Sequence, residues 1–315
     1  MKVFLYFHKN QRTAFRRPLA VIKKHITLKK NILKISLLLF VLFLSNCKED
    51  KSNTKKNDIS NKEDLYLGLK PPGLTPKPFA PDIISTEAHL ESVVMFSPDM
   101  KELTFTRQGG EYKKTELFAM QYQNNQWSKP NILAVDNINA YRERFKPSLS
   151  EIKSQEPFKD IPIVGFTVSS SGTIYFYVMD FNDGSGYLSY SRFINGKYET
   201  PQKMNESINS SGKYIAHPFV SPDESYILWD AEKEGEATPD IFISFRQPDG
   251  SWGLAIDLGN QINTPAYEQH VNVTPDGKYL NFWRGNIKVK EDGSSYFIGS
   301  PYWVDTKIIE TLRPQ

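Results

Sequence analysis

The 315-residue sequence contains a single cysteine, Cys47. An intramolecular disulfide, or a zinc or iron–sulfur centre built on cysteines, needs at least two cysteines close together, so the chain can form neither on its own. The sequence also lacks a glycine-rich phosphate loop, a G-x-S-x-G segment and an H-E-x-x-H segment. The residues therefore predict no cofactor, no metal site and no catalytic residue of these familiar kinds.

Acidic residues are absent from the first 46 positions, which hold 10 Lys or Arg. The remaining positions contain 29 basic and 36 acidic residues, a balance of about −7, although the formal charge of the whole chain is +3. A nucleic-acid partner needs a basic face that neutralises phosphates. The acidic body of the chain therefore predicts no nucleic-acid partner, and its 39% hydrophobic content is typical of a folded protein.

No hydrophobic run is long enough to cross a bilayer, which takes about 20 apolar residues. The longest run, residues 35–44, follows a basic region, as in a secretory signal peptide. Residues 44–47, Leu-Ser-Asn-Cys, resemble a bacterial lipobox, although Asn46 departs from the usual small residue before the cysteine. We predict a lipoprotein signal peptide over residues 1–46, lipidation of Cys47, and a lipid anchor in the outer membrane of the cell envelope, on the periplasmic or the exposed side.

Two segments precede the body of the chain. Residues 48–64 contain one Ile and no aromatic residue, too little apolar surface to offset the entropy of ordering, so we predict a lipidated and disordered tether over residues 47–64. Residues 65–81 contain five prolines, which exclude a helix. We expect an extended strap over residues 65–85 that pairs with a C-terminal strand near residues 302–305.

The body of the chain repeats. Residues 96–105, 220–229 and 273–282 each combine an apolar strand end, a Pro-Asp turn and an alternating strand, and residues 168–176 form a weaker fourth copy. Two further markers keep the same phase, an aromatic residue at Trp127, Tyr198 and Trp252, and an Ile-Asn pair beginning at Ile138, Ile208 and Ile262. The first interval is 71 residues for one marker and 70 for the other, and the second is 54 for both. This period predicts hairpins that recur at a fixed interval.

A repeat of about 50 residues has room for four short strands, which is the blade of a β-propeller. We therefore predict an all-β fold over residues 65–315, a β-propeller of about five or six four-stranded blades. A sandwich has similar strands but no reason to repeat its turns. The first interval exceeds the others by about 17 residues, and the excess lies in residues 145–161. We interpret this segment as one degenerate blade.

At these hairpins the chain resembles the WD40-like β-propeller repeat of the TolB type. The resemblance covers residues 65–315, and it is closest at residues 261–268 (QINTPAYE) and 274–278 (TPDGK). Met100 and Glu224 replace the turn glycine of that pattern, and residues 169–172 lack its Pro-Asp. The resemblance implies a propeller, often in envelope proteins that bind other proteins or peptidoglycan-associated partners, and it implies no catalytic residue.

The most repeated carboxylates are Asp99, Asp223 and Asp276, which we interpret as turn residues that bond their own backbone. His217 and His270 each lie five residues before the turn proline of their repeat, on the innermost strand, and His89 lies nine residues before its own. These imidazoles could bind a metal or a carboxylate ligand, or could make ordinary hydrogen bonds.

Four more side chains stand near the same strand starts. Together with His217 and His270 they form the candidate ligand-binding mouth, and they are Glu143, Arg144, Tyr267 and Glu268. Such a mouth could bind a peptide or a sugar. The alternative is that these groups form salt bridges between blades.

The sequence thus favours a non-catalytic envelope lipoprotein that binds a protein or glycan partner. A glycosidase is the alternative, with a carboxylate pair drawn from Glu91, Glu143 and Glu268. An assembly scaffold that binds a partner through its rim loops is a third interpretation.

Overall fold

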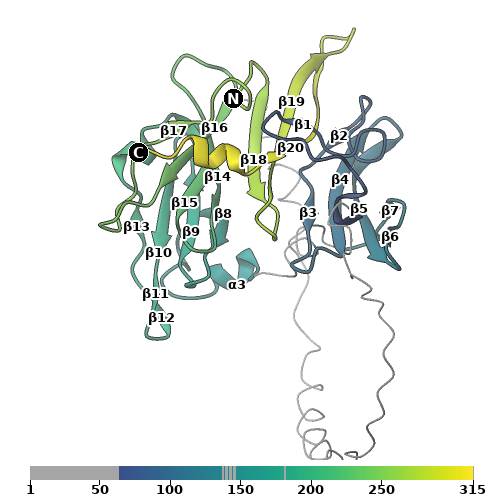
Figure 1. Ribbon diagram of the computed structural model, residues 1–315. Helices are drawn as coiled ribbons and strands as arrows, with labels where there is room; N and C mark the ends of the chain where they lie inside the picture. The colour runs from purple at the N-terminus through teal and green to yellow at the C-terminus, as the bar shows by residue number, and fades with distance from the viewer. Residues whose placement is uncertain are drawn as a thin grey trace, which may run out of the picture. The chain divides into compact units, whose positions relative to one another are not determined.

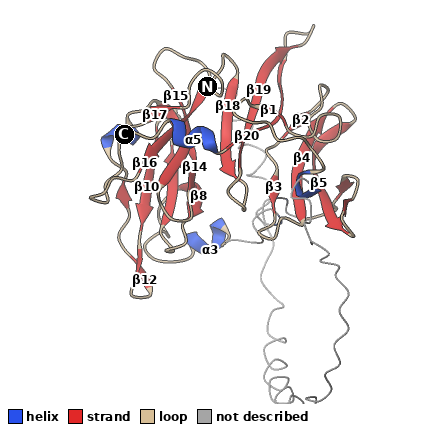
Figure 2. Ribbon diagram, viewed as in Figure 1, coloured by secondary structure: helices blue, strands red, loops and turns tan. Residues whose placement is uncertain are grey.

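The computed structural model describes residues 64–314, apart from 137, 139, 140, 142, 143, 145, 146 and 181. Nearly all of its regular structure is β-strand (Figures 1 and 2). The predicted signal peptide, Cys47, the tether up to residue 63 and Glu143 lie outside the described residues. Within the described part, no helix has both the length and the apolar character that a membrane-spanning helix needs.

The strands form four groups of four antiparallel strands, which we call blades 1 to 4; blades 1 and 4 are joined into one ten-stranded sheet by the parallel pairing of Leu90 with Gly299. Blade 1 contains β2 (Leu90–Glu91) and β3 (Met95–Phe96) as a broken inner strand, then β4 (Glu102–Gly109), β5 (Tyr112–Gln123) and β7 (Asn131–Ile132), with β6 (Gln126–Trp127) at the end of β5. Blade 2 contains β8 (Ile163–Val168), β9 (Ile174–Met179), β10 (Gly186–Ser191) and β13 (Gln202–Lys203), with the hairpin β11 (Phe193–Ile194) and β12 (Lys197–Tyr198).

The last two blades follow the same order from inner to outer strand. Blade 3 contains β14 (Lys213–Val220), β15 (Tyr226–Glu232), β16 (Pro239–Phe245) and β17 (Ile256–Asp257). Blade 4 contains β18 (Tyr267–Val273), β19 (Tyr279–Val289), β20 (Ser295–Asp305) and β1 (Lys77–Pro78). The short helices are η1 (Asp64–Tyr66), α3 (Leu149–Lys153), α4 (Glu206–Asn209) and α5 (Lys307–Thr311). Repeated four-stranded meanders of this kind are the blades of a β-propeller, so the predicted fold class is confirmed.

The outer strand of blade 4 comes from the other end of the chain. Lys77 pairs with Trp303 and Pro78 with Tyr302, and the amide of Phe79 donates to the carbonyl of Pro301 at 2.8 Å. Phe79 is fully buried against the indole of Trp303. The prediction that the proline-rich strap pairs near residues 302–305 is therefore confirmed, and this pairing covers an edge of β20 that would otherwise be open.

The repeated turns explain both the pattern and its departures. The fourth turn residue has a left-handed backbone, with φ of 60° at Met100, 59° at Glu224 and 75° at Gly277. Glycine adopts this conformation without strain, whereas Met and Glu do not. Asp99 and Asp276 accept backbone hydrogen bonds two residues on, from Lys101 and Lys278.

Asp223 behaves in the same way toward the amide of Ser225. All three repeated aspartates are therefore turn residues, as the pattern predicts. Hydrogen bonds within the turn, the first from the Ser97 hydroxyl, hold the pKa of Asp99 below its usual value.

The described residues form four blades rather than five or six. In the segment interpreted as a degenerate blade, Leu149–Lys153 form α3 instead of a strand. Ser148 caps this helix and Glu151 completes a capping box, so the local sequence specifies a helix start. Ile152 and Phe158 are buried in a cluster with residues of β8 and β9, so the segment packs onto blade 2.

Candidate functional site

Two of the predicted site residues, His217 and His270, lie together. They come from β14 and β18, the inner strands of blades 3 and 4, and their rings are in contact, with centroids 3.7 Å apart and tilted at an interplanar angle of 41°. Neither residue is fully buried, and the His217 side chain is 20% exposed. The structure thus brings these two imidazoles to one partly accessible place.

A buried carboxylate holds both histidines. Asp230, on β15 of blade 3, is fully buried. Its Oδ2 lies 2.9 Å from Nδ1 of His217 and accepts a hydrogen bond from the backbone amide of His270 at 3.0 Å. Because Nδ1 of His217 faces a carboxylate, its other ring nitrogen, Nε2, is the one turned away from Asp230.

The backbone at both histidines is unusual in the same way. φ is 49° at His217 and 57° at His270, and each lies in a one-residue bulge where the register with the next strand shifts. Left-handed non-glycine residues and bulges both carry a local cost and occur preferentially near functional sites. The same backbone conformation in blades 3 and 4 thus accompanies the contact between the two imidazoles.

Blade 2 contributes Tyr177 from β9. Its ring lies 5.4 Å from that of His217, between centroids. Gly165 makes room for this ring, because a Cβ at that position would lie 2.7 Å from Cε1 of Tyr177. Burial and the nearby charge of Asp230 raise the pKa of Tyr177 well above its usual range, so the phenol keeps its proton. We call His217, Asp230, His270 and Tyr177 the inner-strand cluster.

Glu268, by contrast, does not join the cluster. It is fully buried, where its carboxylate accepts hydrogen bonds from the hydroxyl and amide of Thr264 and pairs with Nε of Arg284 at 2.7 Å. Burial raises the pKa of Glu268, and the contacts with Thr264 and Arg284 oppose that shift. Its observed contacts are those of an internal salt bridge within blade 4.

Glu91 makes the corresponding contacts in blade 1. It is fully buried, accepts a hydrogen bond from the hydroxyl of Thr86 at 2.6 Å, and lies 3.3 Å from Nε of Arg107. Both glutamates face an arginine sixteen residues later, directly across the strand pair. The two described carboxylates that the glycosidase alternative requires are thus each committed to a buried ion pair.

The remaining predicted mouth residues lie apart from the inner-strand cluster. Arg144 pairs with Glu102 and stacks on the ring of Tyr141, at 3.9 Å from its centroid. Tyr267 packs edge-on against Phe297. His89 is bound by Thr86 and Glu111 through its two ring nitrogens, away from the other histidines.

Among the described residues, no group of three or more His, Cys, Asp or Glu side chains is arranged to hold a metal ion. The inner-strand cluster offers two imidazoles, but Asp230 already uses Oδ2 for both histidines. The arrangement suits hydrogen bonding to a ligand rather than metal coordination.

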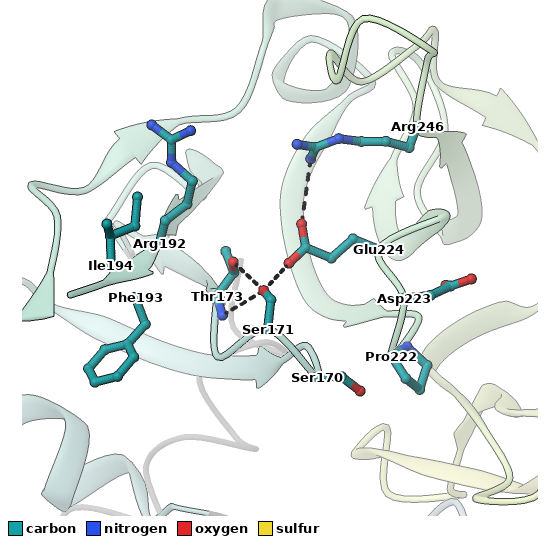
Figure 3. Close-up of a pocket in the computed structure, with 10 residues that line it drawn as sticks. All are labelled: Ser170, Ser171, Thr173, Arg192, Phe193, Ile194, Pro222, Asp223, Glu224 and Arg246. Carbon is teal, nitrogen blue, oxygen red and sulfur yellow. Dashed lines mark hydrogen bonds and ion pairs between the residues drawn. The ribbon is translucent and has the colours of Figure 1, made fainter. Parts of the chain in front are cut away.

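A second concave site lies between the outer turns of blades 2 and 3 (Figure 3). This blade 2–3 pocket has a volume of about 650 Å³ and is open to solvent. It is lined by residues from three segments, the β8–β9 turn, the β10–β11 region and the β14–β15 turn, together with Arg246. Such a volume falls in the range of ordinary small-ligand sites.

Sequence reasoning missed Asp230, Tyr177 and Arg246. Asp230 carried a usable signal, since it is a charged residue in the otherwise apolar stretch from Ile227 to Ala231. A buried charge in a strand requires a partner, and the partner here is His217. Tyr177 and Arg246 carried no such signal, because their importance depends on which blades lie side by side.

No family model matches the sequence, and no curated protein matches it. Among solved structures, the chain is similar to an endo-arabinase from Bacteroides thetaiotaomicron VPI-5482, with 9% identity and a TM-score of 0.40 over 69% of this chain and 96% of that one. The β-propeller domain of the Trilobed protease from Pyrococcus furiosus is 8% identical, with a TM-score of 0.27 over 69% of this chain and 54% of that one.

A functionally unknown protein from Desulfotomaculum acetoxidans DSM 771 is 12% identical, with a TM-score of 0.27 over 66% of this chain. The chain spans only 55% of that protein's length. Likenesses at these levels carry no argument about function, so function has to be argued from the residues of this chain.

Proposed function

We propose that this protein is a lipid-anchored envelope β-propeller that binds a protein or glycan partner at the inner-strand cluster without catalysing a reaction. The observation that carries the proposal is the contact between the rings of His217 and His270, held by the buried Asp230. Three blades contribute to this cluster, so the packing of these blades pre-organises it and little entropy is lost when a ligand binds.

Binding is favoured over catalysis by the state of the acidic groups. A glycosidase needs two carboxylates within reach of one bond, one of them able to exchange a proton. Glu91 and Glu268 are instead fully buried, each beside an arginine. Asp230 is also fully buried and is committed to the two histidines.

The anchor and the family are part of the same proposal. The ten-residue apolar run before Cys47 supports a lipoprotein signal, and the polar stretch after it supports a tether. The Pro-Asp turns and the strap that completes blade 4 support a TolB-type WD40-like propeller. A tethered propeller can reach partners near the membrane while staying attached to it.

The test compares the native lipidated protein with the His217→Ala/His270→Ala double variant. Each is crosslinked in intact cells, purified and analysed by mass spectrometry, and each is also applied to a glycan array. We expect one partner, protein or glycan, that the double variant loses. Lys114→Gln, a highly exposed position in blade 1, is the control and should retain it.

Two results would contradict the proposal. One is retention of every partner by a folded double variant, which would place binding elsewhere on the propeller. The other is turnover of a glycan substrate, which would make the protein an enzyme. Labelling with a fatty-acid analogue tests the anchor separately, because Cys47→Ser should abolish the label and release the protein from membranes.

A further inference from the structure

The blade 2–3 pocket is built by direct contact between two blades. The amide of Ser170, in the turn of blade 2, donates to the carbonyl of Pro222, in the turn of blade 3, at 2.8 Å. Figure 3 shows the two turns facing each other across this contact. The pocket therefore has a defined floor and does not depend on a single loop.

Glu224, in the turn of blade 3, is hydrogen-bonded to three hydroxyls of blade 2 and so adds to this contact between the blades. Its Oε1 accepts hydrogen bonds from the hydroxyls of Ser169 and Ser171 at 2.7 and 2.6 Å, and its Oε2 accepts one from Tyr175 at 2.9 Å. Burial alone would raise the pKa of Glu224, but these hydroxyl donors outweigh it and lower the pKa below the usual value. The carboxylate is thus charged and already supplied with three donors from blade 2.

Arg246 stands beside this carboxylate without a short bond to it. Its Nη1 lies 3.8 Å from Oε2 of Glu224 and 3.5 Å from the hydroxyl of Tyr175, and its guanidinium stacks on Trp252 at 5.0 Å from the ring centroid. A guanidinium carries five donors in a planar fork. The contact with Trp252 orients the guanidinium. Because its contacts with Glu224 and Tyr175 are long, its N–H groups can still donate to the carboxylate of a ligand.

A second guanidinium and an apolar surface complete the pocket. Arg192 is half exposed and is bound to Glu199 through Nε, and Figure 3 shows its guanidinium across the pocket from that of Arg246. Phe193 and Ile194, on the β11 strand, are 45% and 44% exposed. The lining thus combines two arginines and two carboxylates, Asp223 and Glu224, with paired exposed apolar side chains. The arginines supply the donors for an anion, and the apolar side chains supply a surface for its apolar face.

We propose that the blade 2–3 pocket binds an acidic glycan through a uronic acid residue. The sugar carboxylate would lie against Arg246 and Arg192, the apolar face of the ring against Phe193, and the ring hydroxyls near Ser170 and Ser171. Exposed side-chain hydroxyls suit a polyhydroxylated ring, whereas a peptide terminus is more often held by a strand edge or backbone amides. This site is separate from the inner-strand cluster and does not rest on its function.

The test is calorimetric titration of the full-length protein at low salt with D-glucuronate and with D-glucose, which differ only at C6. We expect glucuronate to bind at least tenfold more tightly than glucose. Arg192→Gln and Arg246→Gln should each weaken glucuronate binding by about tenfold, the usual loss when one charge-assisted contact is removed. Arg192 is exposed, so that variant remains informative if Arg246→Gln fails to fold.

The controls separate the possible sources of a positive result. Lys114→Gln removes one positive charge from blade 1 and should leave the affinity unchanged. Equal binding of glucose and glucuronate, equal binding of acetate and glucuronate, or unchanged affinity in both arginine variants would each overturn the proposal. Binding of N-acetylphenylalanine in place of glucuronate would overturn it in favour of a peptide carboxyl terminus.

Discussion

The imidazole of His217 contacts that of His270 at 3.7 Å between centroids, although the two residues are 53 positions apart in the sequence. The repeat explains this contact, because both occupy the same position of their blades. Asp230 contacts Nδ1 of His217 and the backbone amide of His270, so it anchors the pair.

Replacement of Asp230 tests that anchor. Asp230→Asn keeps the shape of the side chain but removes the carboxylate that faces His217 and the amide of His270. We expect a loss of about 2 kcal/mol of unfolding free energy, since a buried donor loses its charged partner. Urea denaturation measures it. Asp292→Asn, on an exposed turn, is the control. Equal stability of the two variants would contradict the claim that the Asp230 carboxylate stabilises the folded protein.

The buried ion pair of blade 4 can be compared with its counterpart in blade 3. Glu268 faces Arg284, while the residues 53 positions earlier, in blade 3, are Ile215 and Ala231, which are also buried. Arg284→Ala should cost about 3–5 kcal/mol, because it leaves a buried carboxylate without its charged partner. The double variant Glu268→Ile/Arg284→Ala recreates the blade 3 pair and should recover at least half of that loss.

Chemical denaturation of the two single variants and the double variant completes this cycle. Full recovery is not expected, because Arg284 also donates to the carbonyls of Gln261 and Ile262. A double variant that is less stable than Arg284→Ala alone would contradict the expectation that an Ile–Ala pair can replace the ion pair in blade 4.

The lowered pKa of Glu224 predicts that the stability of the protein depends on pH. Its folded pKa lies below the ordinary 4.5, so its hydrogen bonds stabilise the charged form. This contribution is complete above pH 4.5 and is lost as the pH falls through the folded pKa. The melting temperature of Glu224→Gln should therefore lie below that of the unmodified protein at pH 7, and the gap should narrow as the pH falls toward 3.

Differential scanning calorimetry across this pH range measures the gap. Glu291→Gln, on an exposed turn, is the matched control and should follow the unmodified protein at every pH. A gap for Glu224→Gln that stays constant down to pH 3 would mean that the carboxylate charge does not hold blades 2 and 3 together.

The packing of the strap predicts that removing the ring of Phe79 lowers the free energy of unfolding strongly. Phe79 is fully buried between Trp303 and Phe96, on the segment that supplies the outer strand of blade 4. Phe79→Ala should cost about 3–5 kcal/mol and lower solubility, because it leaves a cavity where the strap joins the blade. Leu74→Ala, on an exposed part of the same strap, should cost under about 0.5 kcal/mol. Similar melting temperatures for the two variants would contradict the claim that the strap stabilises blade 4.

The sequence predicted those parts of the fold that repeat. The turns around Asp99, Asp223 and Asp276 recur because each hairpin needs the same backbone, and the proline-rich strap indicated its pairing with β20. The helix α3 was missed although Ser148 and Glu151 form a capping box, because the excess length was interpreted as part of a repeat.

The candidate site was less predictable. The phase of the repeat placed His217 and His270 together, but Asp230 meets them only through the one-residue bulges in β14 and β18. A glutamate at a strand start can face solvent or a neighbouring strand, so sequence alone could not place Glu268 beside Arg284. The blade 2–3 pocket depends on contacts between turns about 50 residues apart, which no local pattern encodes.

The central claim is that a partner occupies the inner-strand cluster in the cell. The most direct measurement is the extent of diethyl pyrocarbonate modification of His217 and His270 in intact cells and in the purified protein, read by mass spectrometry and scaled to the exposed Lys290. We predict that both histidines are protected several-fold in cells and become reactive after purification. Equal modification in the two settings would contradict the account.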